Sequence, residues 1–225
     1  MTKATRDYTN SVALTLAACS TLAVGAGFAI WLLTGGFQHW TFDSLRHDHA
    51  RSGRMSVLPI ELSNFSGETV SPWSRQGPRV VYVVDFIYTR CESVCSVLGS
   101  EFQQMQARLM AARPGTASPR LLSISFDPRD TLEDLSRYAE RYHVAKEVWD
   151  IARPNEAGAL SALLRQLWVV VVPDGRNDFV HNGALSIVDS AGRVHAVFDY
   201  ASWESALACA SAVAGGSHCV SVSLP

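Results

Sequence analysis

The longest pattern in the chain is an apolar run near its start. No charged residue occurs between Ser11 and Gly36. The core of this run, VALTLAACSTLAVGAGFAIWLL, is long enough for a helix that rises about 1.5 Å per residue to cross roughly 30 Å of hydrocarbon. The pattern therefore predicts one membrane-spanning helix, and Trp31 and Trp40 suit the interfacial region near its far end.

Two other interpretations of this run compete with an anchor. A cleaved secretory signal has a shorter apolar region, of about 7 to 15 residues. The tetrapeptide that ends at Cys19, LAAC, looks like a bacterial lipoprotein box with a lipidated cysteine, but the residues after it stay apolar where a lipoprotein has a polar tether. We favour an uncleaved anchor over residues 1–36. Lys3 and Arg6 then place the N-terminus in the cytoplasm and the rest of the chain outside it.

A polar stretch follows the apolar run. Residues 37–57 are expected to form a juxtamembrane connector that is partly helical. His47 and His49 form a His-x-His pair that suits a metal ion, but a solvated connector is the preferred interpretation. Residues 58–225 then make up one domain of ordinary size.

Within residues 58–225 the hydrophobic pattern predicts a mixed α/β fold. Two continuous apolar runs, at 80–88 and 121–126, are typical of strands covered on both faces, and Asp85 is the only break in the first. Other expected elements are a short strand and turn near 58–70, helices over 96–112, 132–142, 156–167 and 202–214, an apolar strand or helix end at 168–172, and a hairpin over 183–200. Thr131 and Asp134 resemble a capping box, and Trp149 is placed in a loop. This order implies a central mixed sheet flanked by helices.

Charge excludes one class of function. The net charge is -2, and only 18% of the residues are charged. A nucleic-acid-binding protein needs a concentrated basic face, which this composition does not provide. The predicted export of the domain bears on its cysteines, because disulfides persist outside the cytoplasm.

The strongest candidate for chemistry is a pair of cysteines. Cys91 and Cys95 follow the strand at 80–88 directly and precede a helix. On the first turn of a helix this spacing puts both sulfurs on one face, and the helix dipole favours thiolate. The spacing alone leaves three alternatives open, which are a structural disulfide, a redox pair and two ligands of a metal ion.

Three segments, in this order along the chain, bear on the interpretation of the cysteine pair. They are DFIYTRCESVCSVLGSEFQQMQARL, LLSISFDPRDTLEDLSRYAERY and FVHNGALSIVDSAGRVHAVFDY. Together they resemble the Sco (SenC) family of membrane-anchored, thioredoxin-like copper proteins, which help to assemble the binuclear copper centre of cytochrome c oxidase. The resemblance covers nearly the whole chain from about residue 58 onward.

The resemblance implies a site and a function. Copper, as Cu(I) or Cu(II), would be held by Cys91, Cys95 and His181. The partner would be the copper-binding subunit of the oxidase or another copper chaperone, reached from a single-pass anchor in the bacterial inner membrane with the domain in the periplasm. Two alternatives remain: a thiol-disulfide reductase that keeps the oxidase cysteines reduced through Cys91 and Cys95, and a non-catalytic assembly or accessory subunit.

This sequence departs from the family pattern near the cysteines. Glu92 and Ser96 stand where most members have proline, and the Asp-Pro-x-x-Asp-Thr motif is shortened by one residue. Asp130 in that motif is a candidate for a position behind the copper ligands or in contact with the partner. Its alternative role is to cap the next helix together with Thr131.

Two further cysteines lie outside these motifs. Cys209 falls in the last predicted helix, and Cys219 follows a flexible Gly-Gly-Ser-His segment. We expect a disulfide that ties the tail to this helix. A second metal site with His218 is the less favoured alternative.

Overall fold

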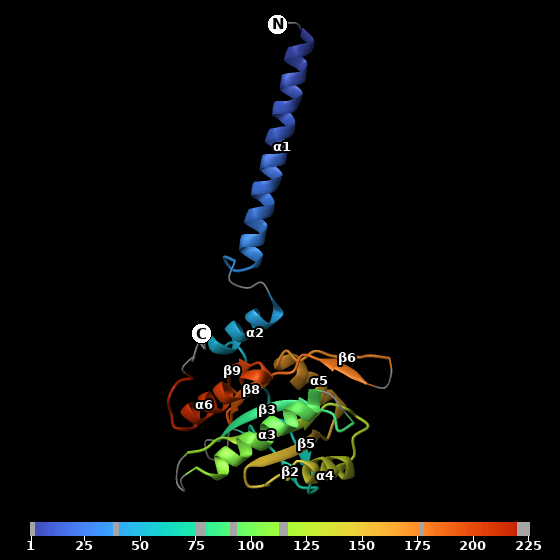
Figure 1. Cartoon of the computed structure of the whole chain (residues 1–225), viewed down its shortest axis with the longest axis vertical. Helices are drawn as coiled ribbons and strands as arrows, with labels where there is room; N and C mark the ends of the chain where they lie inside the picture. Colours follow the sequence, from blue (N-terminus) through green and yellow to red (C-terminus); the bar gives the residue numbers. More distant parts are fainter. Residues whose placement is uncertain are drawn as a thin grey trace. The chain divides into compact units, whose positions relative to one another are not determined.

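The computed structural model describes residues 3–37, 41–74, 80–90, 94–112, 117–175 and 178–219 (Figure 1). Contacts divide the chain into two compact units, Met1–Leu45 and Arg46–Pro225. Each unit is described by itself.

The first unit consists mainly of helix α1 (Lys3–Leu33). Its segment Ser11–Leu33 has 23 residues with a mean hydropathy of 1.9, and none of it is buried in the protein. The predicted apolar helix is confirmed, and its length and composition suit a membrane anchor or a signal sequence. Cys19 lies exposed on this helix as a free cysteine.

Helix α2 (Phe42–Arg51) lies in the stretch predicted as a connector. In the second unit, its residues Arg46 and Ala50 are only 2% and 1% exposed. The ring of His49 packs on Trp168 at 4.8 Å between centroids, and Arg46 donates a hydrogen bond to the Trp168 carbonyl. This half of the expected connector therefore packs against the domain instead of being solvated.

The second unit is built on a seven-stranded mixed sheet in the order β2-β1-β5-β4-β3-β8-β9. Pairs β3–β4 and β4–β5 are parallel, and the other pairs are antiparallel. The strands are β1 (Leu62–Asn64), β2 (Thr69–Val70), β3 (Val81–Ile87), β4 (Arg120–Ser125), β5 (Trp149–Pro154), β8 (Leu185–Asp189) and β9 (Val194–Phe198). A separate hairpin joins β6 (Val171–Pro173) to β7 (Phe179–His181).

Most of the predicted strands are confirmed, and one prediction is wrong. Strands β3 and β4 and the β8–β9 hairpin occur where the apolar pattern placed them. Trp149, however, begins strand β5 and does not lie in a loop. The local sequence WDIARP mixes charged residues and proline with apolar ones, but parallel pairing with β4 and antiparallel pairing with β1 fix it as a central strand. Pairing with strands that are distant in the sequence therefore makes this segment a strand.

Helices cover both faces of the sheet. Buried residues of α3 (Val94–Met110), α4 (Leu132–Arg141) and α6 (Trp203–Ala214) form one core cluster with the sheet. On the other face, α5 (Ala157–Gln166) and the end of α2 contribute to a second cluster, which includes the fully buried Trp73. The predicted mixed α/β architecture is confirmed.

Gly99 fixes how closely α3 approaches the end of α4. A Cβ atom at this position would lie 2.3 Å from the ring of Tyr142. Only glycine leaves room for that ring, which is itself 8% exposed. The close contact sets the position of the first half of α3, the helix that carries Cys95.

Candidate metal centre

The candidate centre lies where β3 ends. Parallel strands β3 and β4 finish at the same edge of the sheet, and residues Tyr88–Arg90 lead from β3 toward the cysteine pair. Cys91 and Glu92 lie outside the described residues. Cys95 and Ser96 belong to the first turns of α3, and the description does not extend to their side chains.

His181 reaches the same edge from a different part of the chain. It is the last residue of β7, and its ring lies 5.1 Å from that of Phe126 and 6.5 Å from that of Tyr88, between centroids. Tyr88 follows β3 by one residue, and Phe126 follows β4 by one residue. The fold therefore brings the predicted histidine ligand beside the segment that runs into Cys91, although 90 residues separate His181 from Cys91 in the sequence.

An aromatic group holds the hairpin that carries His181. Phe179 packs edge-on against both Tyr88 and Phe126, at 5.3 Å between centroids in each case. The Tyr88 hydroxyl donates a hydrogen bond to Asp178, the residue before β7. This hydrogen bond holds the pKa of Asp178 below its usual range. Ring packing and one polar contact thus fix the hairpin to the sheet edge.

Asp130 holds the segment that leads from β3 to Cys91. Its side chain is fully buried and accepts three hydrogen bonds, from the Thr89 amide at 2.9 Å, the Thr89 hydroxyl at 2.7 Å and the Ser125 hydroxyl at 2.6 Å. Thr89 stands two residues before Cys91. The carboxylate therefore fixes the backbone that leads into the cysteine pair.

Asp130 does not cap α4. Thr131 is the N-cap, and it forms a full capping box with Asp134. The predicted pairing of Thr131 and Asp134 is confirmed, whereas the capping role considered for Asp130 is wrong because its carboxylate faces Thr89 and Ser125.

Arg129 contacts both the turn that contains Asp130 and the hairpin that carries His181. Its guanidinium forms a salt bridge with Asp127 at 2.8 Å and lies 5.4 Å from the centre of the Phe179 ring. Burial acts to raise the pKa of Asp127, but hydrogen bonds and charge from Arg129 hold that pKa below its usual value. Arg90 donates to the Arg129 carbonyl at 3.1 Å. The segment before Cys91, the Asp127–Asp130 turn and the His181 hairpin are thereby linked.

A second buried carboxyl group lies in the middle of β3. Asp85 is 1% exposed, on the face of the strand that also carries Val83 and Ile87. Burial raises the pKa of Asp85 to about 7, a hydrogen bond from Ser123 opposes the shift, and the charge of Glu101 adds to it. Among the described residues, none donates a hydrogen bond to its Oδ1 atom. Burial together with the charge of Asp199 raises the pKa of Glu101 to about 7 as well.

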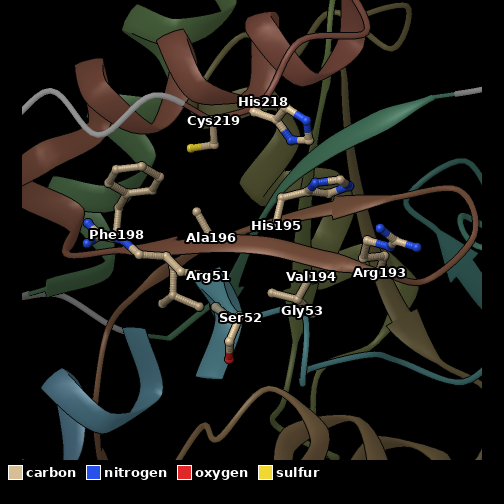
Figure 2. Close-up of a pocket in the computed structure, with 12 residues that line it drawn as sticks. Arg51, Ser52, Gly53, Arg193, Val194, His195, Ala196, Phe198, His218 and Cys219 are labelled. Atoms are coloured by element: carbon tan, nitrogen blue, oxygen red, sulfur yellow. The ribbon is translucent and has the colours of Figure 1, made fainter. Parts of the chain in front are cut away.

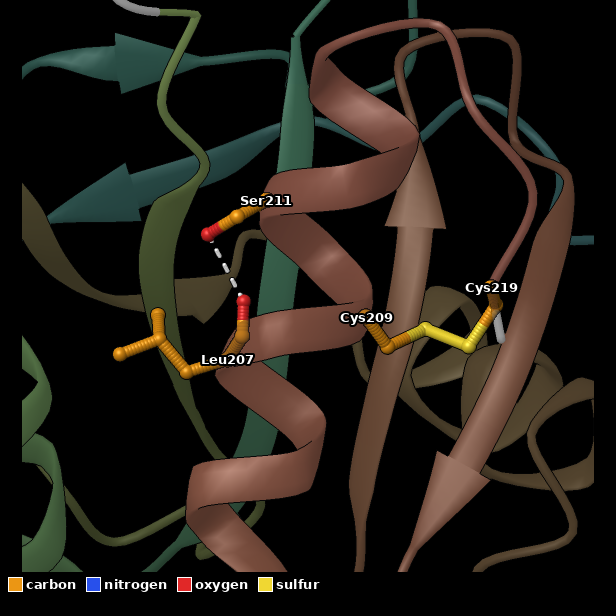
Figure 3. Close-up of a disulfide and its surroundings, with 4 residues drawn as sticks. All are labelled: Leu207, Cys209, Ser211 and Cys219. Atoms are coloured by element: carbon orange, nitrogen blue, oxygen red, sulfur yellow. Dashed lines mark hydrogen bonds between the residues drawn. A yellow bond between two sulfur atoms is a disulfide. The ribbon is translucent and has the colours of Figure 1, made fainter. Parts of the chain in front are cut away.

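The two C-terminal cysteines are joined. Cys209 of α6 and Cys219 form a disulfide with their Cα atoms 4.7 Å apart (Figure 3). This is the bridge that the sequence analysis favoured. Within the residues that the structure describes, which omit Cys91, no three His, Cys, Asp or Glu side chains are grouped to hold a metal ion.

Several residues around His181 were not identified from the sequence. These are Tyr88, Phe126, Asp178 and Phe179, which pack on the histidine or hold its hairpin. The positions of Tyr88 and Phe126, each just beyond a predicted buried strand, were a usable signal, because strand ends of a parallel pair meet at one edge.

Comparison with known proteins identifies the family. The family model described as SCO1/SenC matches residues 52–214. The chain belongs to the SCO1/SenC family. The match begins shortly after α2 and ends with α6, so it covers nearly the whole second unit of the structure.

Individual relatives agree with this assignment. A "SCO1 protein homolog" from Bacillus subtilis (strain 168) is 26% identical over 141 residues, which cover 61% of this chain and 70% of the relative. The structure of BsSco, a member of the Sco family of cytochrome c oxidase assembly proteins, has a TM-score of 0.61 and 22% identity, with 72% of this chain and 94% of that chain covered. Arabidopsis thaliana ScoI, solved with copper bound, has a TM-score of 0.55 and 15% identity over 71% and 96%.

These structures show the fold. It is the mixed α/β, thioredoxin-like fold of the Sco family, as the resemblance implied. Of these two, BsSco is a member of a family of cytochrome c oxidase assembly proteins, and Arabidopsis thaliana ScoI was solved with copper bound.

Proposed function

We propose that this chain is a membrane-anchored copper chaperone that delivers copper to the binuclear copper centre of cytochrome c oxidase. Cys91, Cys95 and His181 are its copper ligands. The observation that carries the proposal is the placement of His181 at the edge where β3 ends, beside Tyr88 and Phe126. Family membership supports the same conclusion.

The ligand set suits a transferable copper ion. Thiolate sulfur prefers Cu(I), and an imidazole serves both Cu(I) and Cu(II). Three protein ligands leave the ion accessible, so a partner that presents its own thiolates can take it by ligand exchange. The partner is the copper-binding subunit of the oxidase or another copper chaperone.

The surrounding residues position the ligands. Asp130 fixes Thr89, two residues before Cys91, and so holds the backbone that leads toward the cysteines. The ring contacts of Tyr88 and Phe179 hold the hairpin of His181. Asp130 is thus a positioning residue that stands behind the ligands.

Helix α1 and the disulfide support the proposed topology. Residues 1–36 form a single-pass anchor in the bacterial inner membrane with a cytoplasmic N-terminus, and residues 37–57 connect it to a periplasmic copper-binding domain at 58–225. A bridge between Cys209 and Cys219 supports this placement, because such bonds persist in the periplasm and are rare in the cytoplasm.

Replacing the histidine tests the proposal. We expect His181→Ala to weaken Cu(II) binding by at least about 100-fold, since even groups behind metal ligands are worth about 10- to 100-fold in affinity. The measurement is an anaerobic copper titration of the reduced full-length protein in detergent, followed by thiolate-to-copper charge-transfer absorption. Val180→Ala is the matched control, because Val180 is the adjacent hairpin residue and is 66% exposed.

Unchanged copper affinity in His181→Ala, with the far-UV circular dichroism of the parent, would exclude the three-ligand site. Turnover of a disulfide substrate that needs no copper and survives His181→Ala would instead favour the thiol-disulfide reductase. Co-purification with an oxidase after loss of both Cys91 and Cys95 would favour an accessory subunit.

A further inference from the structure

Trp168 follows helix α5 in a backbone conformation that favours glycine. The helix ends at the C-cap Leu167. The Trp168 amide donates to the Arg165 carbonyl at 3.2 Å, and the Val169 amide donates to the Leu164 carbonyl at 2.8 Å. This is the Schellman arrangement, in which the residue after the C-cap is left-handed and usually glycine. Trp168 has a φ of +54°. A bulky residue is uncommon in that region, so the contacts of its side chain need an explanation.

The indole of Trp168 is where helix α2 packs on the domain. The His49 ring lies 4.8 Å from the Trp168 ring between centroids. Arg46, which is 2% exposed, donates through Nη1 to the Trp168 carbonyl at 3.4 Å. A buried charged group needs such an acceptor. Trp168 therefore gives α2 a ring to pack on, which glycine at this position would not provide.

The residues that follow α2 are fixed to the domain as well. The Val57 amide donates to the Gly192 carbonyl at 2.7 Å, and the Val194 amide donates to the Met55 carbonyl at 3.2 Å. A Cβ atom on Gly192 would lie 2.4 Å from the Val57 carbonyl oxygen, so this approach requires glycine. Between the two places of contact, Gly53 lines a cavity of about 440 Å³ together with residues of β9 (Figure 2). Residues 46–57 are thus held against the domain at two places.

The carbonyl that accepts from Arg46 also accepts from Asn182, the residue after His181. The Asn182 Nδ2 atom donates to the Trp168 carbonyl at 3.1 Å, and its Oδ1 atom accepts from the Val170 amide at 2.7 Å. The next pair along the hairpin is Val171 with His181. Asn182 therefore closes the open end of the β6–β7 hairpin, and one carbonyl joins this end to α2.

We propose that α2 positions His181 for copper through Trp168 and Asn182. The inference rests on the proposed function, because it takes His181 as a copper ligand. Trp168 and Asn182 are positioning residues that act through the backbone of the hairpin. Phe179 fixes the hairpin near its turn, and Asn182 fixes it at its open end. A ligand on a hairpin held in this way loses little freedom when the ion binds, which raises affinity.

Two variants break this link and leave His181 in place. His49→Ala removes the ring that packs on Trp168, and Asn182→Ala removes the side chain that closes the hairpin. We expect both to speed the amide hydrogen exchange of β6 and β7 in the full-length protein in detergent, because local opening governs exchange. Cu(II) affinity should fall about tenfold in Asn182→Ala. It should fall about threefold in His49→Ala, which acts over a longer distance.

Controls separate positioning from general stability. Arg51→Ala is the control on α2, because the Arg51 side chain is exposed and forms no hydrogen bond or ion pair with the residues that the structure describes. It should change neither measurement. His49→Phe keeps a ring beside Trp168 and should restore both values to near those of the parent. Exchange in β3 and β4 should stay at the parental rate in every variant, since these strands belong to the central sheet.

The inference is wrong if His49→Ala leaves exchange in β6 and β7 at the parental rate. It is also wrong if that exchange rises while copper affinity stays parental and His181→Ala still loses copper. Faster exchange throughout the sheet would contradict it too, because α2 would then stabilise the whole domain. Failure of the proposed function gives a different result: His181→Ala binds copper as the parent does, whereas exchange in the hairpin still responds to His49→Ala.

Discussion

Asp85 and Asp130 are both buried aspartates close to the same strand, yet their surroundings are opposite. Asp130 follows β4 and accepts three hydrogen bonds through its carboxylate. Asp85 lies in the middle of β3, in a face that is otherwise apolar, and burial raises its pKa to about 7. Two equally buried carboxyl groups therefore differ in the number of hydrogen-bond donors around them, which is one of the factors that set the pKa of such a group.

The difference separates two uses of a buried acid. Hydrogen bonds from Thr89 and Ser125 to Asp130 tie Thr89 to the turn after β4, so the group organises the entry to the cysteine pair. Asp85 has too few donors to stabilise a charge, and it is held in its neutral form at mildly acidic pH. The first group is a structural support of the candidate site, and the second makes the stability of the fold depend on pH.

Removing Asp130 should have the largest effect. Asp130→Ala leaves the Thr89 amide, the Thr89 hydroxyl and the Ser125 hydroxyl without their acceptor, and we expect it to lower the free energy of unfolding by about 3–5 kcal/mol. Copper affinity should fall by about 10- to 100-fold as well, because Thr89 leads into Cys91. Urea unfolding of the full-length protein in detergent and the copper titration measure the two effects.

Asp130→Asn separates charge from shape in this support. The amide keeps one acceptor and nearly the same volume, so its effect on both measurements should fall between those of the parent and the alanine variant. Parental copper affinity in a folded Asp130→Ala protein would show that Asp130 does not position the cysteine segment.

Neutralising Asp85 should have the opposite sign. An unfolded aspartate has a pKa of about 3.9, and that of Asp85 in the folded protein is about 7. Between these values the folded state binds a proton that the unfolded state has released, so the stabilising contribution is present below about pH 4 and is lost as the pH rises to about 7. Asp85→Asn should therefore be more stable than the parent by about 2–4 kcal/mol at pH 8 and close to it at pH 4.

Urea unfolding at several pH values from 4 to 8 measures this difference. Glu101→Gln should change the same pH profile in the same direction, because it removes both the charge that helps to raise the pKa of Asp85 and a carboxyl group whose own pKa is raised to about 7. An Asp85→Asn protein that is destabilised equally at pH 4 and pH 8 would mean that Asp85 is needed for its hydrogen bond with Ser123 and that its ionisation has no part in stability.

The apolar pattern predicted most of this fold, and its failures have a physical cause. Strands β3 and β4 are long apolar runs, so burial on both faces determined them locally. Strand β5 contains Asp150 and Arg153, and only its partners β4 and β1 make it a strand. The Asp150 carboxylate is satisfied by Arg120, 30 residues away, at 2.9 Å. A single sequence does not reveal such a distant partner.

In the candidate site, too, some features are set by the local sequence and others by contacts between distant residues. Motifs placed His181 and Asp130 among the candidate functional residues, because their sequence context resembles the family. What each side chain touches depended on contacts across the fold, such as Asp130 with Thr89, which lies 41 residues earlier. For that reason the sequence left two roles open for Asp130. The structure excludes the capping role, because the carboxylate bonds to Thr89 and Ser125, and the position behind the copper ligands stays a prediction.

The smallest predicted effect comes from the neighbour of Asp130. Thr131→Ala removes the N-cap of α4, whose hydroxyl accepts from the Asp134 amide at 3.2 Å, and loss of such a cap costs about 1 kcal/mol of stability. Copper affinity should stay at the parental value, because Thr131 supports α4 and Asp130 supports the segment before Cys91. Unfolding and copper titration of Thr131→Ala beside Asp130→Ala therefore separate the two adjacent roles. A loss of copper affinity in Thr131→Ala equal to that in Asp130→Ala would mean that α4 and the cysteine segment act as one unit, and that the carboxylate of Asp130 has no separate positioning role.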